Sequence, residues 1–265
     1  TALDGIEDID GRLLIGLTLL VSGLGFKMAA VPFHMWAPDV YEGAPLPVTA
    51  YIAVGSKVAA FALVLRLFAE GLLPAIDQWN VLIAGLAALT MLFGNLVALA
   101  QTNVKRMLAY SSVGQVGFLL MGVAALSTLS SNGLMVHLVG YSVTNLAVFI
   151  AITAFYNATG KQEISDFAGL ADRSPFLAAA ITISLFSLAG LPFLAGFVTK
   201  FYLFSAAAAE DLLWLAGVAM VASLISLYYY LKVIREMYLN LAADGEGSTI
   251  QIPGLLYGLV GVLVI

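Results

Sequence analysis

One stretch of the sequence decides the fold: Gly23-Leu-Gly-Phe-Lys27-Met-Ala-Ala-Val-Pro32-Phe-His34-Met-Trp-Ala-Pro38-Asp39-Val-Tyr-Glu42-Gly-Ala-Pro45. It begins as an apolar helix long enough for a membrane, and it then carries a lysine with glycines before it and a proline after it. An ionisable residue inside a membrane is costly, which makes it a candidate functional residue. Interrupted helices beside such residues are typical of ion-transporting membrane proteins, where they line a cavity inside the protein.

The composition places the whole chain in a membrane. Hydrophobic residues make up 62% of it, charged residues make up 10%, and the mean hydropathy is +1.00. A soluble domain is about half apolar and about a quarter charged. Runs of about twenty apolar residues recur from end to end, which is the length that crosses a bilayer. We therefore predict an all-α, polytopic transmembrane helical bundle, a single domain over residues 1–265 with the lipid bilayer as its partner.

Several kinds of site are excluded or disfavoured by the residue types. Cysteine is absent, which excludes disulfides, iron–sulfur clusters and thiolate metal sites within this chain. The two histidines are far apart in the sequence, so we expect no metal and no cofactor here. The basic residues are scattered, and we expect no nucleic acid partner. The sequence starts at Thr1 without a signal-peptide pattern and ends in a short apolar run, so we expect an internal piece of a longer protein.

The apolar runs predict eight spans separated by short polar connections. The segment 39–45 is expected to be a turn, 128–132 a short connection and 160–173 the longest polar connection. The predicted spans are 12–36 with a break, 46–68, 79–100, 107–127, 133–157, a sixth after Pro175 to 209 interrupted at 190–196, 212–235, and an eighth that begins near Pro253.

The basic residues of the short loops predict the orientation. Arg12 and Arg66 fall on the face where the first span begins. The opposite face holds six basic residues: Lys105, Arg106, Lys161, Arg173, Lys232 and Arg235. Because loops rich in lysine and arginine stay in the cytoplasm, the opposite face is predicted to be cytoplasmic.

Three lysines remain inside the spans: Lys27, Lys57 and Lys200. No acidic residue lies in the middle of any span, so either the lysines are neutral part of the time or their partners lie elsewhere. Both arrangements suit proton transfer, because a lysine poised between charge states can take up and release a proton. Snorkelling to the interface is the alternative, and it explains a lysine near a helix end better than one at mid-span. Lys27 and Lys200 each lie beside a Gly/Pro break, and paired breaks point to a transport site.

Weaker candidates surround these lysines. His34 and His137 are possible proton relays, although a hydrogen-bonded structural histidine fits each position too. Asp39 and Glu42 are expected to brace the turn rather than carry protons. Four aromatic residues are expected to be anchors at the membrane interface: Trp36, Tyr41, Trp79 and Trp214.

Short motifs add a resemblance that covers nearly the whole chain. They are Gly25-Phe-Lys27 with the following Pro-Asp and Gly-Ala-Pro, Gly55-Ser-Lys57, Asn103-Val-Lys-Arg106-Met-Leu-Ala-Tyr-Ser-Ser112, and Leu191-Pro192 through Gly196-Phe-Val-Thr-Lys200-Phe-Tyr202. The chain resembles the antiporter-like membrane subunits of respiratory complex I and its relatives. Gly-Phe-Lys and Gly-Ser-Lys favour the subunit N branch, which is the NdhB type in the photosynthetic complex.

The resemblance implies a fourteen-helix subunit in which two five-helix inverted repeats each contain a broken helix. It places 12–68 at the end of the first repeat and 79–236 in the second. Lys27 then matches the proton-path lysine of the seventh helix, Lys57 that of the eighth and Lys200 that of the broken twelfth. The family pairs the first of these with a glutamate on its fifth helix, which would lie before Thr1.

The resemblance also implies a function. The chain would be a proton-translocating membrane subunit of an NADH- or ferredoxin:quinone oxidoreductase in the bacterial inner membrane. It would carry no redox centre, and its partners would be the other membrane-arm subunits, with quinone bound elsewhere in the complex. The alternatives are a membrane subunit of a cation/proton antiporter or a membrane-bound hydrogenase, and a structural scaffold without connected polar cavities between the lysines.

Overall fold

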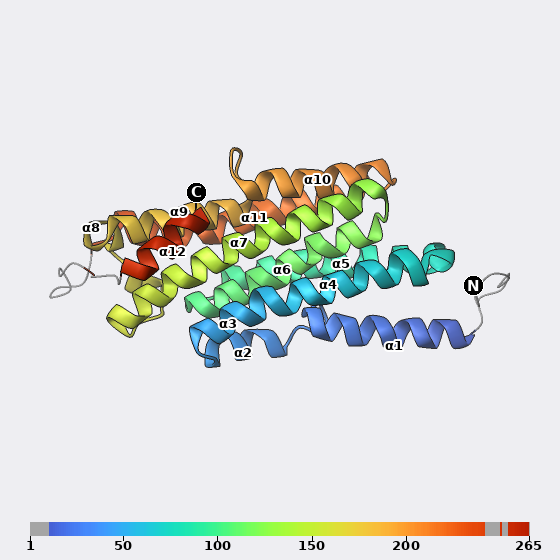
Figure 1. Cartoon of the computed structure of the whole chain (residues 1–265), viewed down its shortest axis with the longest axis horizontal. Helices are drawn as coiled ribbons and strands as arrows, with labels where there is room; N and C mark the ends of the chain where they lie inside the picture. Colours follow the sequence, from blue (N-terminus) through green and yellow to red (C-terminus); the bar gives the residue numbers. More distant parts are fainter. Residues whose placement is uncertain (1–10, 242–249, 251–253, 265) are drawn as a thin grey trace.

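The computed structural model of the chain describes residues 11–241, 250 and 254–264. All regular elements within these ranges are helices, apart from one isolated antiparallel bridge between Asn103 and Glu163. Long helices lie side by side in one bundle and turn back at its two ends (Figure 1). The all-α prediction is therefore confirmed.

The elements follow one another as a series of helices, some with short π-helical or 3-10 stretches at their ends. They are α1 (Gly11–Met28), α2 (Trp36–Gly43), α3 (Leu46–Tyr51), η1 (Ile52–Ser56), α4 (Lys57–Arg66), η2 (Leu67–Gly71), η3 (Leu73–Ala75), α5 (Ile76–Leu99), α6 (Val104–Ala124), α7 (Thr128–Thr159), η4 (Ile164–Phe167), α8 (Leu170–Arg173), α9 (Pro175–Ala189), α10 (Ala195–Ala209), α11 (Leu213–Leu239) and α12 (Gly254–Val264).

Five helical stretches in the described ranges are long and apolar enough to cross a membrane. They are Leu46–Gly71, Leu73–Leu99, Val104–Ala124, Thr128–Thr159 and Leu213–Leu239. Shorter apolar helices cover Leu14–Met28, Pro175–Ala189 and Ala195–Ala209. The chain is thus an integral membrane protein. We call the end of the bundle where α5, α7 and α11 finish the basic end, because Lys105, Arg106, Lys232 and Arg235 lie on it; in Figure 1 it is on the left.

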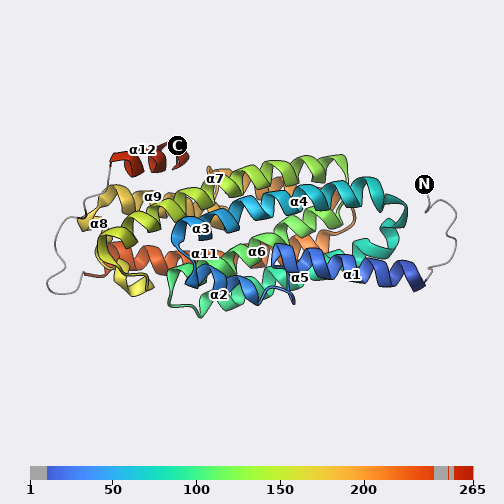
Figure 2. The same cartoon turned by 60° about the horizontal axis from the view of Figure 1, so that its bottom comes forward.

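Helix α6 is the centre of the bundle. All its residues are buried except Arg106 and Tyr110, which are partly exposed. The helix begins at Asn103, whose side chain accepts hydrogen bonds from the main-chain nitrogens of Lys105 (2.9 Å) and Arg106 (3.2 Å), as a helix N-cap does. Helices α2, α5, α7 and α10 pack around it (Figure 2). Polar side chains on α6 are therefore enclosed by protein and must find partners there.

The first break lies between α1 and α2. The chain leaves the α1 direction at Ala29, whose φ is +62°, and the main-chain nitrogen of Val31 donates to Thr90 Oγ1 on α5 at 3.1 Å. The segment expected to be a turn is partly wrong, because Trp36–Gly43 forms the half-helix α2, which ends just before Pro45. The predicted connection 128–132 is also wrong. Helix α7 starts there, since Ser127 and Ser130 form a capping box.

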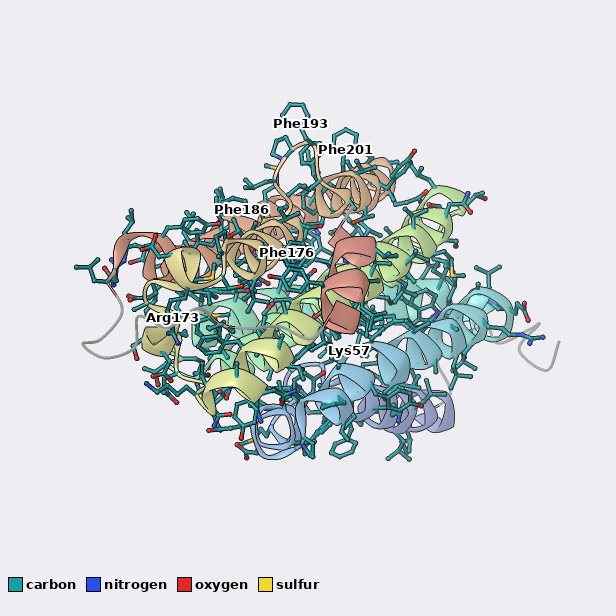
Figure 3. The ribbon with its side chains drawn as sticks, turned by 60° about the vertical axis from the view of Figure 1, so that its left-hand side comes forward. Lys57, Arg173, Phe176, Phe186, Phe193 and Phe201 are labelled. Atoms are coloured by element: carbon teal, nitrogen blue, oxygen red, sulfur yellow. The ribbon has the colours of Figure 1, made fainter. Side chains whose placement is uncertain are left out.

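The second break separates α9 from α10, as the sequence predicted. Helix α9 ends at Gly190 with a φ of +87°, and Pro192 cannot continue a helix. A Cβ at Gly196 would overlap the main-chain oxygen of Ser187, so only glycine lets the two half-helices approach this closely. Phe193 lies in the connection and points away from the bundle (Figure 3).

Two of the four expected interface anchors are buried instead. Trp79 is fully buried, packs edge-on against Phe68 and donates to the main-chain oxygen of Leu72 at 2.8 Å. Tyr41 is 1% exposed and its hydroxyl reaches Ser112 on α6. Aromatic composition alone does not separate a membrane anchor from a core residue, because both environments favour a large ring with one polar atom.

Candidate proton-relay site

Lys57 is the first residue of α4, directly after the π-helical stretch η1. Its side chain is only 4% exposed, and Figure 3 marks its place within the bundle. The ammonium donates to the main-chain oxygen of Ser112 at 2.7 Å and also to the hydroxyl of Ser112. A charge that is buried needs such partners, and here uncharged oxygens of α6 supply them.

Two tyrosine hydroxyls extend the polar cluster around Lys57. Tyr141 on α7 reaches Ser112 Oγ at 3.0 Å and donates to the main-chain oxygen of Ala53 at 3.1 Å. Tyr41 on α2 reaches the same Ser112 Oγ at 3.3 Å. Ala53 belongs to η1, and π-helical turns often occur at functional sites. Ser112 therefore joins four helices at one buried hydroxyl.

Lys200 lies on α10 and is 3% exposed. Its ammonium donates to the main-chain oxygens of Leu188 (2.9 Å) and Ala189 (3.1 Å), and it reaches Ser223 Oγ on α11 at 3.4 Å. The two carbonyls end α9, where a helix carries partial negative charge. The break thus exposes carbonyls that a continuous helix would use internally, and the lysine occupies them.

Gln115 connects the two lysine sites. Its Nε2 donates to the main-chain oxygen of Leu188 at 3.0 Å, the same acceptor that Lys200 uses. Gln115 and Ser112 are three residues apart on α6, a rise of roughly 4.5 Å, so they lie on one side of the helix. Ser112 binds Lys57 and Gln115 lies beside Lys200, so α6 carries a polar stripe from one lysine to the other.

His137 on α7 is buried beside this stripe. Its Nδ1 lies 2.9 Å from Thr199 Oγ1, and Thr199 donates its hydroxyl proton to the main-chain oxygen of Gly196. Nδ1 is therefore the protonated nitrogen of the neutral ring, which leaves Nε2 as a buried acceptor without a partner among the described residues. His137, Gln115 and Lys200 all line a cavity of about 10 Å³, close to the room that one water molecule needs.

The other two predicted site residues lie apart from this stripe. Lys27 is exposed on the outer side of α1, so the expectation of a buried ammonium is wrong for the chain as given. His34 is buried, but its ring packs against Phe93 (centroids 4.8 Å apart) and Tyr110, and its Nδ1 has no hydrogen-bond partner in the described part of the chain. Neither residue has a hydrogen bond to Lys57 or Lys200 among the bonds that the structure describes.

Asp39 and Glu42 brace the first break, as the sequence suggested. Both carboxylates bond Arg106 Nη1, at 2.8 Å and 2.7 Å. Lys105 Nζ donates to the main-chain oxygen of Ala44 at 3.1 Å. These contacts fasten α2 to the start of α6 and hold Tyr41 next to Ser112.

Among the residues with described positions, no carboxylate forms an ion pair with Lys57 or Lys200, and no group of three His, Cys, Asp or Glu could hold a metal. The sequence analysis missed Ser112, Gln115 and Tyr141. A signal existed for the first two, because they are polar residues at i and i+3 within an apolar span. Tyr141 carried no such signal, because its hydroxyl meets Ser112 only through tertiary packing.

The chain belongs to the family of membrane subunits shared by NADH:quinone oxidoreductases and Mrp antiporters, since the model of that family matches residues 6–226. Subunit N of the NADH-quinone oxidoreductase of Moorella thermoacetica is 48% identical over 254 residues, which cover 96% of this chain and 53% of that protein. The expected likeness to the subunit N branch is thus confirmed. The chain spans about half the length of the curated relatives it matches.

Solved structures agree with this fold. A chain of respiratory complex I from Thermus thermophilus superposes with a TM-score of 0.81 at 32% identity, over 98% of this chain and 57% of that one. A chain of the Mrp complex from Dietzia gives a TM-score of 0.87 at 24% identity, over 99% of this chain and 57% of that one. The second likeness concerns the fold alone, and both support the antiporter-like architecture.

Proposed function

We propose that this chain conducts protons as part of a membrane subunit of an NADH- or ferredoxin:quinone oxidoreductase. Protons reside on Lys57 and Lys200 and pass between them along the polar stripe of α6. One observation carries the proposal: both buried ammonium groups are held by uncharged oxygens rather than by carboxylates. A lysine without a fixed counter-charge can lose its proton without leaving a buried anion behind.

The chemistry of the complex is divided between its subunits in this proposal. Electron transfer takes place in other subunits, and this chain translocates protons without redox chemistry of its own. Quinone binds elsewhere, and the other membrane-arm subunits and the lipid bilayer are the partners. The complex lies in a bacterial inner membrane, with the loops of Lys105, Arg106, Lys161 and Arg173 facing the cytoplasm.

Lys27 has a separate place in the proposal. The resemblance gives it a glutamate partner on a helix that the given sequence does not contain, and its side chain is exposed on α1. A charge change in neighbouring subunits alters that pairing and so alters the proton affinity of Lys27. Lys27 thereby couples the stripe to events elsewhere in the complex. His34 and His137 are proposed as relays beside the lysines.

The test uses the intact complex in inverted membrane vesicles. We expect Lys57→Met and Lys200→Met to lower proton pumping per electron by on the order of tenfold or more, because loss of a positioned acid–base group commonly reduces a rate that far. Lys232→Met, at the basic end, is the matched control and should pump normally. Normal pumping in both buried-lysine variants would reject the proposal. Sodium–proton exchange without electron-driven pumping would favour the antiporter alternative.

A further inference from the structure

A second set of buried polar side chains leads from the basic end toward the lysines. It consists of Asn95 on α5, Tyr229 and Tyr230 on α11, and Ser111 on α6, and we call it the hydroxyl branch. The exposed fractions are 2%, 1%, 0% and 3% in that order. None of these residues takes part in the relay described above, although Ser111 directly precedes Ser112.

The members of the branch touch one another. The hydroxyl of Tyr229 donates to Asn95 Oδ1 at 3.0 Å, and Asn95 Nδ2 donates to the main-chain oxygen of Met91 at 2.7 Å. The rings of Tyr229 and Tyr230 meet edge to face with centroids 4.4 Å apart. The hydroxyl of Tyr230 is hydrogen-bonded to that of Ser111. The branch therefore runs without interruption from α5 through α11 to α6.

The outer end of the branch lies close to the basic end. Asn95 is four residues before the end of α5 at Leu99, a rise of roughly 6 Å, or about one helical turn. The amide of Asn95 is held by its own helix at Met91, so its Oδ1 keeps a fixed direction toward Tyr229. A proton that enters at this end meets the hydroxyl of Tyr229 first.

The inner end of the branch meets the lysine row at Gln115. Gln115 follows Ser111 by four residues on α6, so the two share one face of the helix, and it also lies beside Tyr230. Gln115 Oε1 is buried and has no hydrogen-bond partner in the described part of the chain. A buried acceptor of this kind calls for a donor, and the hydroxyl of Tyr230 can rotate between Ser111 and Gln115.

We propose that the hydroxyl branch carries protons from the basic end to Lys200, a path that rests on the proposed function. Each hydroxyl takes a proton on its oxygen and passes its own proton onward, so the branch is unchanged after each transfer. The amides of Asn95 and Gln115 orient the hydroxyls at the two ends. The small cavity that Gln115 and Lys200 both line has the size of one water molecule, and the proton ends on a neutral Lys200 Nζ.

Buried tyrosines are also common as plain packing residues, and the experiment must separate the two roles. Tyr→Phe removes only the hydroxyl, so a packing role predicts a loss of about 1 kcal/mol in stability with normal proton pumping. The test uses Tyr229→Phe, Tyr230→Phe and the double variant in the intact complex. Tyr228→Phe is the matched control, because Tyr228 is on the same helix but 68% exposed.

We expect each single variant to lower the pumping rate several-fold and the double variant to lower it no further, because the hydroxyls act in series. Tyr228→Phe should pump as the unchanged complex does. Ser111→Ala removes the contact from the α6 side and should give the same loss if a tyrosine variant fails to assemble. Normal pumping in Tyr230→Phe and Ser111→Ala would overturn the branch. If Lys57→Met and Lys200→Met still lose pumping, the proposed function stands; normal pumping in these lysine variants overturns both proposals.

Discussion

Gln115 and Lys200 donate to one and the same oxygen, the main-chain carbonyl of Leu188, at 3.0 Å and 2.9 Å. Gln115 comes from the central helix α6 and Lys200 from the half-helix α10, whereas Leu188 belongs to the last turn of α9. The shared acceptor makes the break a meeting point of three helices. A change in the position of α9 against α10 moves the partners of both side chains together.

Gln115→Leu should interrupt the polar stripe while the bundle stays folded. Lys200 still satisfies the carbonyl of Leu188, so the loss of stability should be about 1 kcal/mol or less. We expect proton pumping per electron to fall several-fold in inverted vesicles. Gln101→Leu is the matched control, because Gln101 bonds only Val97 of its own helix turn. Equal pumping in the two variants would show that the stripe does not join the lysines.

Lys57→Arg should keep the positive charge and lose the relay. Arginine remains protonated in proteins, so it cannot release the proton that Lys57 passes on. Electron transfer with little or no proton pumping is the expected result, measured as NADH oxidation beside acidification of the vesicle interior. Lys232→Arg should behave as the unchanged complex. Pumping at the normal rate in Lys57→Arg would mean that Lys57 supplies charge alone.

Gly196→Ala should destabilise the second break. The added Cβ would overlap the carbonyl oxygen of Ser187, and backbone cannot give way as a flexible side chain can. Overpacking of this kind costs about 2 kcal/mol or more, which should lower the midpoint of thermal unfolding. Gly217→Ala in α11 meets nothing within 4 Å and should be neutral or stabilising by about 0.5 kcal/mol, since alanine favours helix. An unchanged midpoint in Gly196→Ala would contradict the close approach.

Arg106→Ala should loosen α2 from α6. It removes both carboxylate contacts, and Asp39 and Glu42 are left close to each other without a cation between them. We expect a loss of about 1 kcal/mol, smaller at high salt, and faster proteolysis near the first break. Arg66→Ala removes the exposed pair with Glu70 within one helix and should change stability by about 0.3 kcal/mol at most. Equal effects of the two variants would argue against the brace.

Much of the architecture could be predicted from the chain, and the reason is physical. A bilayer imposes one length and one polarity on every span, so apolar runs predict the helices closely, and the Gly/Pro pair at 190–192 predicted the second break. Helix ends were predicted less well. Helix α2 was expected to be a turn, because its prolines and glycines were weighed without the ion pairs of Arg106 that hold it in place.

The sequence by itself determined the class of fold, the two interrupted helices and the choice of Lys57 and Lys200, because a lysine in the middle of an apolar span has few explanations. Only the tertiary structure decided what those lysines touch. Ser112, Gln115 and Tyr141 are unremarkable in the sequence, and they become partners because α6 is enclosed on all sides. Lys27 shows the converse: its position in the sequence resembles that of the other two lysines, yet its side chain is exposed, because burial depends on which helices pack against α1.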